Sequence, residues 1–192
     1  YAGKSIVIMA LALIAKDLGK KVGYFKPIGT ESIRSLKGKI LDEDAETMKS
    51  LLELKGDTRI YCPITLKKHI FLEDFTPRYS SKYINEIFTA YEEASREKDI
   101  MLIEGASTLS SGAFIKCSVP QLAAEFDADV LLVSRFENDN IVDEILQACD
   151  YALRWNTQIS GVIINRVPKS MMERTEHMIK PLLEDNGIKV LG

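Results

Sequence analysis

The chain has little of the chemistry that marks zinc-binding or disulfide-rich proteins. Its 192 residues include three cysteines and two histidines, and the cysteines are far apart in the sequence. Without a Cys-x-x-Cys pair, neither a zinc site nor a disulfide framework is indicated. We therefore expect the thiols of Cys62, Cys117 and Cys149 to be buried or half-buried in a protein of the reducing cytoplasm.

The chain also lacks a long apolar run and a strong excess of either charge. The leading apolar stretch "SIVIMALALIA" has 11 residues, which is too short to span a bilayer. No small-residue cleavage signal follows it. The formal net charge of -3 argues against a nucleic-acid partner, because such proteins usually carry a basic face. We expect no membrane and no nucleic-acid partner, and one globular domain over residues 1–192.

What the sequence does contain is an alternation of short apolar strands and amphipathic helices. The predicted strands are 21–29, 99–106, 129–135 and 158–167, with another beginning at 188. The predicted helices are 3–18, 44–54, 83–94, 118–128, 141–149 and 169–187. The stretch 30–46 is interpreted as a loop that overlaps the start of helix 44–54, and 57–81 fits no clear element. This alternation predicts an α/β fold, a mostly parallel sheet flanked by helices.

In such sheets ligands bind beyond the carboxyl ends of the strands, so polar residues at those ends are candidate ligand contacts. Lys26 ends the first predicted strand, and Glu104 ends the second, directly before Gly105. A carboxylate there suits a metal-binding role and a lysine suits a phosphate-facing role. The alternative for Glu104 is a strand that merely reaches solvent, and the alternative for Lys26 is an ordinary surface lysine.

Two polar stretches suggest binding sites for a phosphate and its cation. One stretch begins the leading helix, and the other follows residue 40. Gly3-Lys4-Ser5 matches the second half of the phosphate-binding loop G-x-x-x-x-G-K-[ST], whose amides and lysine hold phosphates. This triplet also arises by chance at helix starts. The acids of "LDEDAE" include Asp44, which could hold Mg²⁺ or cap the helix that follows.

These pieces occur in a familiar order. "YAGKS", "GYFKPIG", "DEDAETMKSLL", "MLIEGA" and "GVIINRV" resemble, along nearly the whole chain, dethiobiotin synthetase and its relatives, which include the MinD-type ATPases. The resemblance is greatest to the N-terminal domain of phosphotransacetylase-type proteins that contain a DRTGG domain. It implies the three-layer sandwich of a P-loop NTPase. It also implies a fragment without the first strand and without a C-terminal regulatory or acyltransferase domain.

The resemblance also implies roles for individual residues, with ATP and Mg²⁺ as cofactors. Gly3, Lys4 and Ser5 would bind phosphates, and Lys4 and Lys26 would act in catalysis. Ser5 would join two acidic residues, Asp44 and Glu104, in holding Mg²⁺. The amide of Asn165, at the end of a late strand, would read the edge of adenine, which requires both a donor and an acceptor.

Two functions follow from the resemblance, and departures from the family's pattern bear on them, among them the loop "IGTESIRSLKGK" after Pro27. The loop "EGASTLSSG" carries Ser107 and Thr108 where the synthetases usually have glycines. This favours an ATPase or nucleotide-sensing domain of a phosphotransacetylase-like protein. The alternative is an ATP-dependent carboxylate–amine ligase or cyclo-ligase such as dethiobiotin synthetase. The partner in both is a nucleotide, and the family leaves a homodimer open.

Overall fold

The computed structural model describes residues 2–29, 32–34, 40–66 and 80–192. It divides into two compact units, one of Ser5–Val119 and one of Tyr1–Lys4 with Pro120–Gly192. No helix within the described ranges has both the length and the apolar character needed to cross a membrane.

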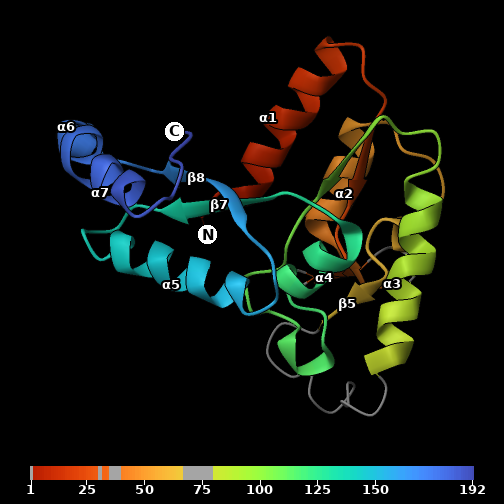
Figure 1. Cartoon of the computed structure of the whole chain (residues 1–192). Helices are drawn as coiled ribbons and strands as arrows, with labels where there is room; N and C mark the ends of the chain where they lie inside the picture. The colour runs from red at the N-terminus through yellow and green to blue at the C-terminus, as the bar shows by residue number, and fades with distance from the viewer. Residues whose placement is uncertain (1, 30–31, 35–39, 67–79) are drawn as a thin grey trace. The chain divides into compact units, whose positions relative to one another are not determined.

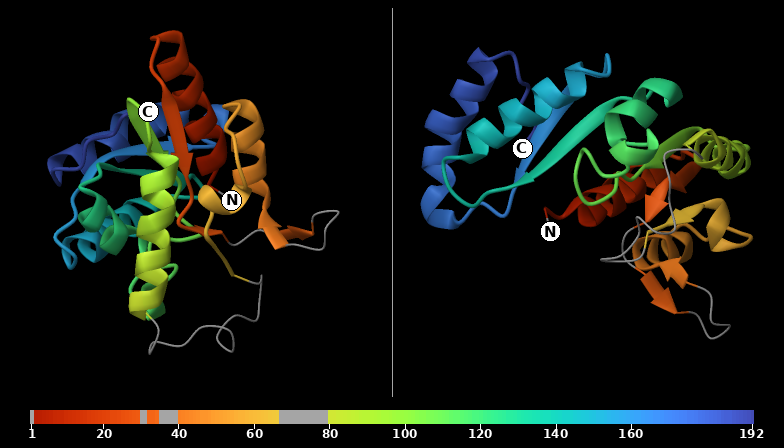
Figure 2. Two further views of the ribbon diagram at one scale, coloured as in Figure 1. Left: turned by 90° about the vertical axis from the view of Figure 1, so that its right-hand side faces the viewer. Right: turned by 90° about the horizontal axis from the view of Figure 1, so that it is seen from below.

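The unit Ser5–Val119 is built around the parallel pair of strands β1 (Val22–Phe25) and β6 (Ile100–Ile103). Figure 2 shows these two strands side by side. Its helices are α1 (Lys4–Asp17) from Ser5 onward, α2 (Glu43–Leu51), α3 (Ser80–Ala94) and the short η1 (Thr58–Ile60) and η3 (Ala113–Ile115). Both α2 and α3 contact β1. A second parallel pair joins β2 (Ile28–Gly29) to β5 (Ile64–Thr65).

One part of this unit differs from the sequence-based prediction. The stretch interpreted as a loop contains the antiparallel strands β3 (Ser32–Arg34) and β4 (Ile40–Asp42). The loop prediction was wrong because it rested on polar composition, whereas a two-stranded ladder is held by backbone hydrogen bonds that polar residues also make. Of the unassigned segment 57–81, residues 67–79 lie outside the described ranges.

The other unit is a β–α–β arrangement with further helices. β7 (Val130–Arg135) and β8 (Ile159–Asn165) pair in parallel along six residues of β7, with α5 (Ile141–Leu153) between them in sequence. In Figure 1, α5 runs along this strand pair. The remaining helical segments are α4 (Val119–Phe126), η4 (Lys169–Met171), α6 (Met172–Arg174), η5 (Thr175–Ile179) and α7 (Lys180–Asp185).

The predicted helix 169–187 forms, but with a π-helical turn at η5 (Thr175–Ile179). Pro181 lies in the first turn of α7. Proline has no N–H to donate and its ring clashes with the carbonyl four residues earlier, so a regular α-helix cannot run through it. A widened turn just before the proline is one way in which a helix accommodates this break.

Apolar side chains of both strands and helices fill the core of each unit. In the unit containing Pro120–Gly192, the core cluster is formed by Phe136, Ile141, Ile145, Val162, Ile164, Ile179, Leu183 and Ile188. The strand predicted from residue 188 is present as a bridge between Val162 and Val190. The predicted α/β fold with parallel strands flanked by helices is therefore confirmed.

The cysteines lie as expected from the sequence. Cys62 and Cys117 are buried and Cys149 is half-buried, and none forms a disulfide. Burial raises the pKa of the Cys62 thiol to about 12, assisted by the nearby charge of Asp42. Burial alone raises the pKa of Cys117 to about 11. Both thiols are therefore protonated, unreactive core groups at neutral pH.

Candidate functional site

The parallel pairing of β1 with β6 brings two of the predicted site residues to one edge. Phe25 pairs with Ile103, so the next residues, Lys26 and Glu104, leave the two strands together. The Glu104 amide donates to the Phe25 carbonyl at 2.8 Å, which continues the ladder by one step. Both side chains are buried, with 3% of Lys26 and 2% of Glu104 exposed.

Ser5, in the first turn of α1, joins this edge to the start of α2. Its Oγ lies 3.0 Å from Asp44 Oδ1 and 2.9 Å from Glu104 Oε1. A hydroxyl has a single hydrogen, so it can donate to only one of these carboxylates at a time. One of the two carboxylate oxygens therefore has no hydrogen from Ser5, although it faces the same point.

Lys26 lies between two acids. Its Nζ is 2.9 Å from Asp42 Oδ1 and 2.6 Å from Asp44 Oδ2. Burial lowers the pKa of this ammonium, but the charge of Asp42, followed by Glu104 and by the hydrogen bonds, outweighs burial and raises the pKa above its usual range. Lys26 is therefore a charged group throughout the physiological pH range.

Asp42, the last residue of β4, both caps α2 and forms an ion pair with Lys26. Its Oδ1 accepts the backbone N–H of Ala45 at 3.1 Å and so caps α2. The prediction that Asp44 caps this helix was wrong, because β4 continues to Asp42 and the helix begins at the next residue. Asp42 Oδ2 is fully buried without a hydrogen-bond partner in the described part of the chain. It lies against Gly29, where an added Cβ would be 2.6 Å from it.

Tyr24, on β1, is a further buried side chain that contacts Glu104. Its hydroxyl donates to Glu104 Oε2 at 2.7 Å. Burial, then the charge of Glu104, raises the Tyr24 pKa well above its usual value, so the hydroxyl is a donor at neutral pH. Burial also raises the pKa of Glu104, and it outweighs the lowering by Lys26 and by the Tyr24 hydrogen bond.

The oxygens gathered around Ser5 suit a magnesium ion. Mg²⁺ prefers hard oxygen ligands in octahedral geometry, which places neighbouring ligand oxygens about 2.9 Å apart for bonds of about 2.0–2.1 Å. The observed separations of Ser5 Oγ from the Asp44 and Glu104 oxygens are 3.0 and 2.9 Å. No group of three or more His, Cys, Asp or Glu side chains among the described residues forms a metal site by itself. An ion here would need further ligands, as Mg²⁺ on nucleotide phosphates has.

Three predicted residues belong to the other unit. Asn165, the last residue of β8, donates from Nδ2 to the carbonyl of Ala2 at 2.8 Å and accepts the Arg166 N–H on Oδ1 at 2.9 Å. Gly3 has a φ of +92°, and a Cβ there would be 2.3 Å from Asn165 Nδ2. Glycine suits position 3 because residues with a Cβ rarely adopt this φ, and a Cβ there would also displace the Asn165 amide. Lys4 follows it as the first residue of α1.

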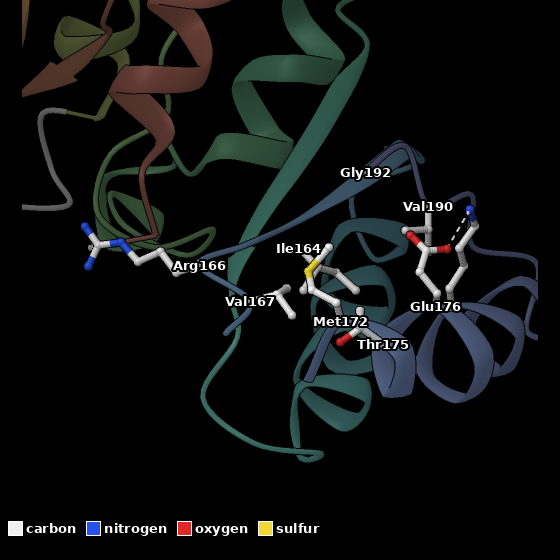
Figure 3. A pocket seen from close by; sticks show the side chains of 9 residues that line it. Ile164, Arg166, Val167, Met172, Thr175, Glu176, Val190 and Gly192 are labelled. Carbon is white, nitrogen blue, oxygen red and sulfur yellow. Dashed lines mark ion pairs between the residues drawn. The ribbon is translucent and has the colours of Figure 1, made fainter. Parts of the chain in front are cut away.

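A cavity of about 240 Å³ lies beyond the end of β8. Its lining is formed by Ile164, Arg166, Val167, Met172, Thr175, Glu176, Lys180, Val190 and Gly192. Figure 3 shows the Arg166 side chain extending away from the others, while Glu176 and Lys180 form an ion pair with 3.5 Å between Oε2 and Nζ. Asn165 does not line this cavity, although both of its sequence neighbours do.

Sequence reasoning had missed Tyr24 and the pairing of Asp42 with Lys26. Alternation along β1 carried a signal for Tyr24, because residues two apart on a strand face the same side. No comparable signal existed for Asp42, which is one of three acids in a short stretch.

Comparison with known proteins agrees with the predicted resemblance at the level of the family. The ATP-dependent dethiobiotin synthetase BioD of Bacillus cereus is 26% identical over 196 residues, which cover 99% of this chain and 77% of the relative. The protein of that name from Methanococcus vannielii is 25% identical over 197 residues, which cover 99% of this chain and 86% of the relative. These relatives give no support to the narrower resemblance to phosphotransacetylase-type proteins.

A family match covers the entire sequence. Residues 1–192 match the family described as AAA domain, and the parallel strands flanked by helices agree with its P-loop architecture. The chain therefore belongs to this AAA domain family of P-loop proteins and is similar to the dethiobiotin synthetases along its whole length.

Proposed function

We propose that this chain binds ATP with Mg²⁺ and uses it in carboxylate–amine ligase chemistry of the kind that the dethiobiotin synthetases perform. The observation that supports this best is the meeting of Ser5, Asp44 and Glu104 oxygens next to the buried ammonium of Lys26. The relatives named above favour the ligase over a nucleotide sensor, which the sequence alone had put first.

In this proposal Ser5, Asp44 and Glu104 hold the magnesium ion. The ion would neutralise charge on the phosphate oxygens when bound. Gly3 and Lys4 would contact the phosphates through a backbone amide and an ammonium. Lys26, charged and held beside Asp44, would face the phosphoryl group as it is transferred and stabilise its developing charge.

Asn165 has the capacity to read a base as well as to hold the backbone. Its side-chain amide has two N–H donors and two acceptor lone pairs. The contacts with Ala2 and Arg166 use one of each. One donor and one acceptor are left, which is the pair that the edge of adenine requires. We include adenine recognition by Asn165 in the proposal.

The reaction has three steps if it follows the chemistry of dethiobiotin formation. An amine first adds to CO2, which bicarbonate supplies by losing water, and forms a carbamate with release of a proton. A carbamate oxygen then attacks the γ-phosphorus, and the bond from that phosphorus to the β–γ bridging oxygen breaks to release ADP. The neighbouring amine then attacks the carbonyl carbon of the mixed anhydride. Phosphate leaves and the cyclic urea closes.

The test is to measure ADP formation by the full-length protein with ATP, Mg²⁺, bicarbonate and the vicinal diamino acid that has the carbon skeleton of dethiobiotin. We expect ADP formation to depend on both the diamine and bicarbonate. In the Lys4→Ala variant we expect both ADP formation and nucleotide binding to be lost. ATP binding without any diamine-dependent ADP would contradict the ligase proposal.

A second candidate is supported by one loop. Residues 107–111 are rich in hydroxyl groups, and Thr108 N–H donates to Ser111 Oγ at 3.0 Å, so this loop is tied to itself. The synthetases usually have glycines here, which let a substrate approach the backbone. A nucleotide-sensing domain of a phosphotransacetylase-type protein would need no such approach. Tight ATP binding without phosphate release would favour this candidate.

A further inference from the structure

Tyr24 is buried directly beneath the proposed magnesium site. It lies two residues before Lys26, on the same side of β1. In the parallel register Tyr24 pairs with Leu102, which lies two residues before Glu104 on the neighbouring strand. The Tyr24 side chain is completely buried, and 2% of Glu104 is exposed. The fold thus places the Tyr24 hydroxyl next to the Glu104 carboxylate, which is almost completely shielded from water.

The two oxygens of Glu104 have separate partners. Oε2 accepts the Tyr24 hydroxyl at 2.7 Å, and Oε1 lies 2.9 Å from Ser5 Oγ. The terminal torsion of a glutamate is broad and sets the plane of its carboxylate only weakly. A strong donor on one oxygen therefore determines which oxygen is presented to Ser5.

Packing alone does not require this hydroxyl. A phenylalanine would fill nearly the same volume, and burying a hydroxyl has a desolvation cost unless a hydrogen bond offsets it. The partner that offsets it here is Glu104, one of the proposed magnesium ligands. Hydrogen bonds from a surrounding residue to a metal ligand commonly fix its orientation and strengthen metal binding.

We infer that Tyr24 is a positioning residue that fixes the Glu104 carboxylate so that Oε1 faces the magnesium site. This inference rests on the proposed function, because it assigns a role toward the metal that Ser5, Asp44 and Glu104 are proposed to hold. It adds a residue that acts through Glu104 without touching nucleotide or metal itself.

The experiment compares Tyr24→Phe with a matched control, Tyr61→Phe. Tyr61 is also a buried tyrosine, but its hydroxyl donates to the backbone carbonyl of Lys55 at 2.6 Å and not to a carboxylate. Mn²⁺ binding to the ADP complex of the full-length protein is measured by electron paramagnetic resonance of the free ion. We expect Tyr24→Phe to weaken Mn²⁺ binding by about 10-fold and Tyr61→Phe to leave it unchanged.

A second measurement separates positioning from structural damage. ADP affinity in EDTA should be the same in Tyr24→Phe as in the wild-type protein, since the hydroxyl acts through the metal ligand alone. An equal loss of ADP affinity without metal, an unchanged Mn²⁺ affinity, or a Tyr24→Phe protein that does not fold would overturn the inference.

Glu104→Gln tells the two proposals apart. If Glu104→Gln weakens Mn²⁺ binding and Tyr24→Phe does not, the role of Tyr24 is wrong while the proposed magnesium site stands. If neither variant changes Mn²⁺ binding, the proposed site itself is wrong.

Discussion

Asp42 combines a helix cap with a buried ion pair in a single carboxylate. Its Oδ1 accepts both the Ala45 N–H and the Lys26 ammonium, at 3.1 and 2.9 Å. The two interactions have different chemical requirements, because a cap needs only an oxygen acceptor whereas the ammonium needs a negative charge. Substitution by asparagine or alanine should therefore separate them.

Asp42→Asn keeps an effective capping residue and removes the charge. We expect a loss of about 3 kcal/mol in the free energy of unfolding, because removing one member of a buried ion pair leaves its partner poorly compensated. Asp42→Ala should lose about 1 kcal/mol more, since the cap goes as well. Urea unfolding measures both. Equal losses would show that the cap contributes nothing measurable at this position.

The origin of each site residue shows what the sequence could and could not predict. Lys26 and Glu104 could be predicted from the sequence, because each ends an apolar strand and the carboxyl ends of parallel strands lie at the same edge of the sheet. The Asp44 cap was predicted wrongly because three acids in a row offer three equivalent helix starts. The contact of Tyr24 with Glu104 joins segments 80 residues apart, and a single sequence carries no direct record of which distant side chains meet.

Among the elements, the strands of the parallel pairs β1–β6 and β7–β8 were predicted best, whereas β5 lies in the segment that the sequence left unassigned. β7 and β8 are short apolar runs bounded by polar residues, and their length and branched side chains favour a strand over a helix. The β3–β4 pair was missed because its residues include charged and polar ones, and backbone pairing there leaves no apolar alternation to detect. The π turn in η5 could be expected only from the position of Pro181.

Helix α5 provides a test of element packing. Ile145 is completely buried in the core cluster, whereas Leu153, at the end of the same helix, is 59% exposed. Ile145→Ala should lower the free energy of unfolding by about 2–5 kcal/mol and Ile145→Val by about 0.5–1.5 kcal/mol. Leu153→Ala should change it by less than about 0.5 kcal/mol. Chemical denaturation that gives equal losses for Ile145→Ala and Leu153→Ala would contradict the assigned core.

At the scale of the molecule, the proposed ligand should couple to stability. A ligand that binds only the folded state adds about 2.7 kcal/mol at a concentration 100 times its dissociation constant. For a chain of 192 residues this corresponds to a rise of about 5–10 °C in Tm. We expect this rise with ATP and Mg²⁺, and most of it should disappear when EDTA removes the metal.

Hydrogen exchange locates this stabilisation within the chain. Protection on addition of ATP and Mg²⁺ should increase in the first turn of α1, the start of α2 and the segment after β6, which carry Ser5, Asp44 and Glu104. A rise in Tm without added protection in these three segments would place the nucleotide elsewhere.

The arrangement around Lys26 also bears on the form in which a nucleotide can enter. Three carboxylates, those of Asp42, Asp44 and Glu104, surround one ammonium, so with all four groups ionised the cluster carries a surplus of two negative charges. Under the proposed function, this surplus of negative charge would repel a triphosphate that arrives without its cation. This charge would favour binding of the nucleotide as a preformed complex with its cation. It would disfavour binding of inorganic polyanions that are not complexed with a cation.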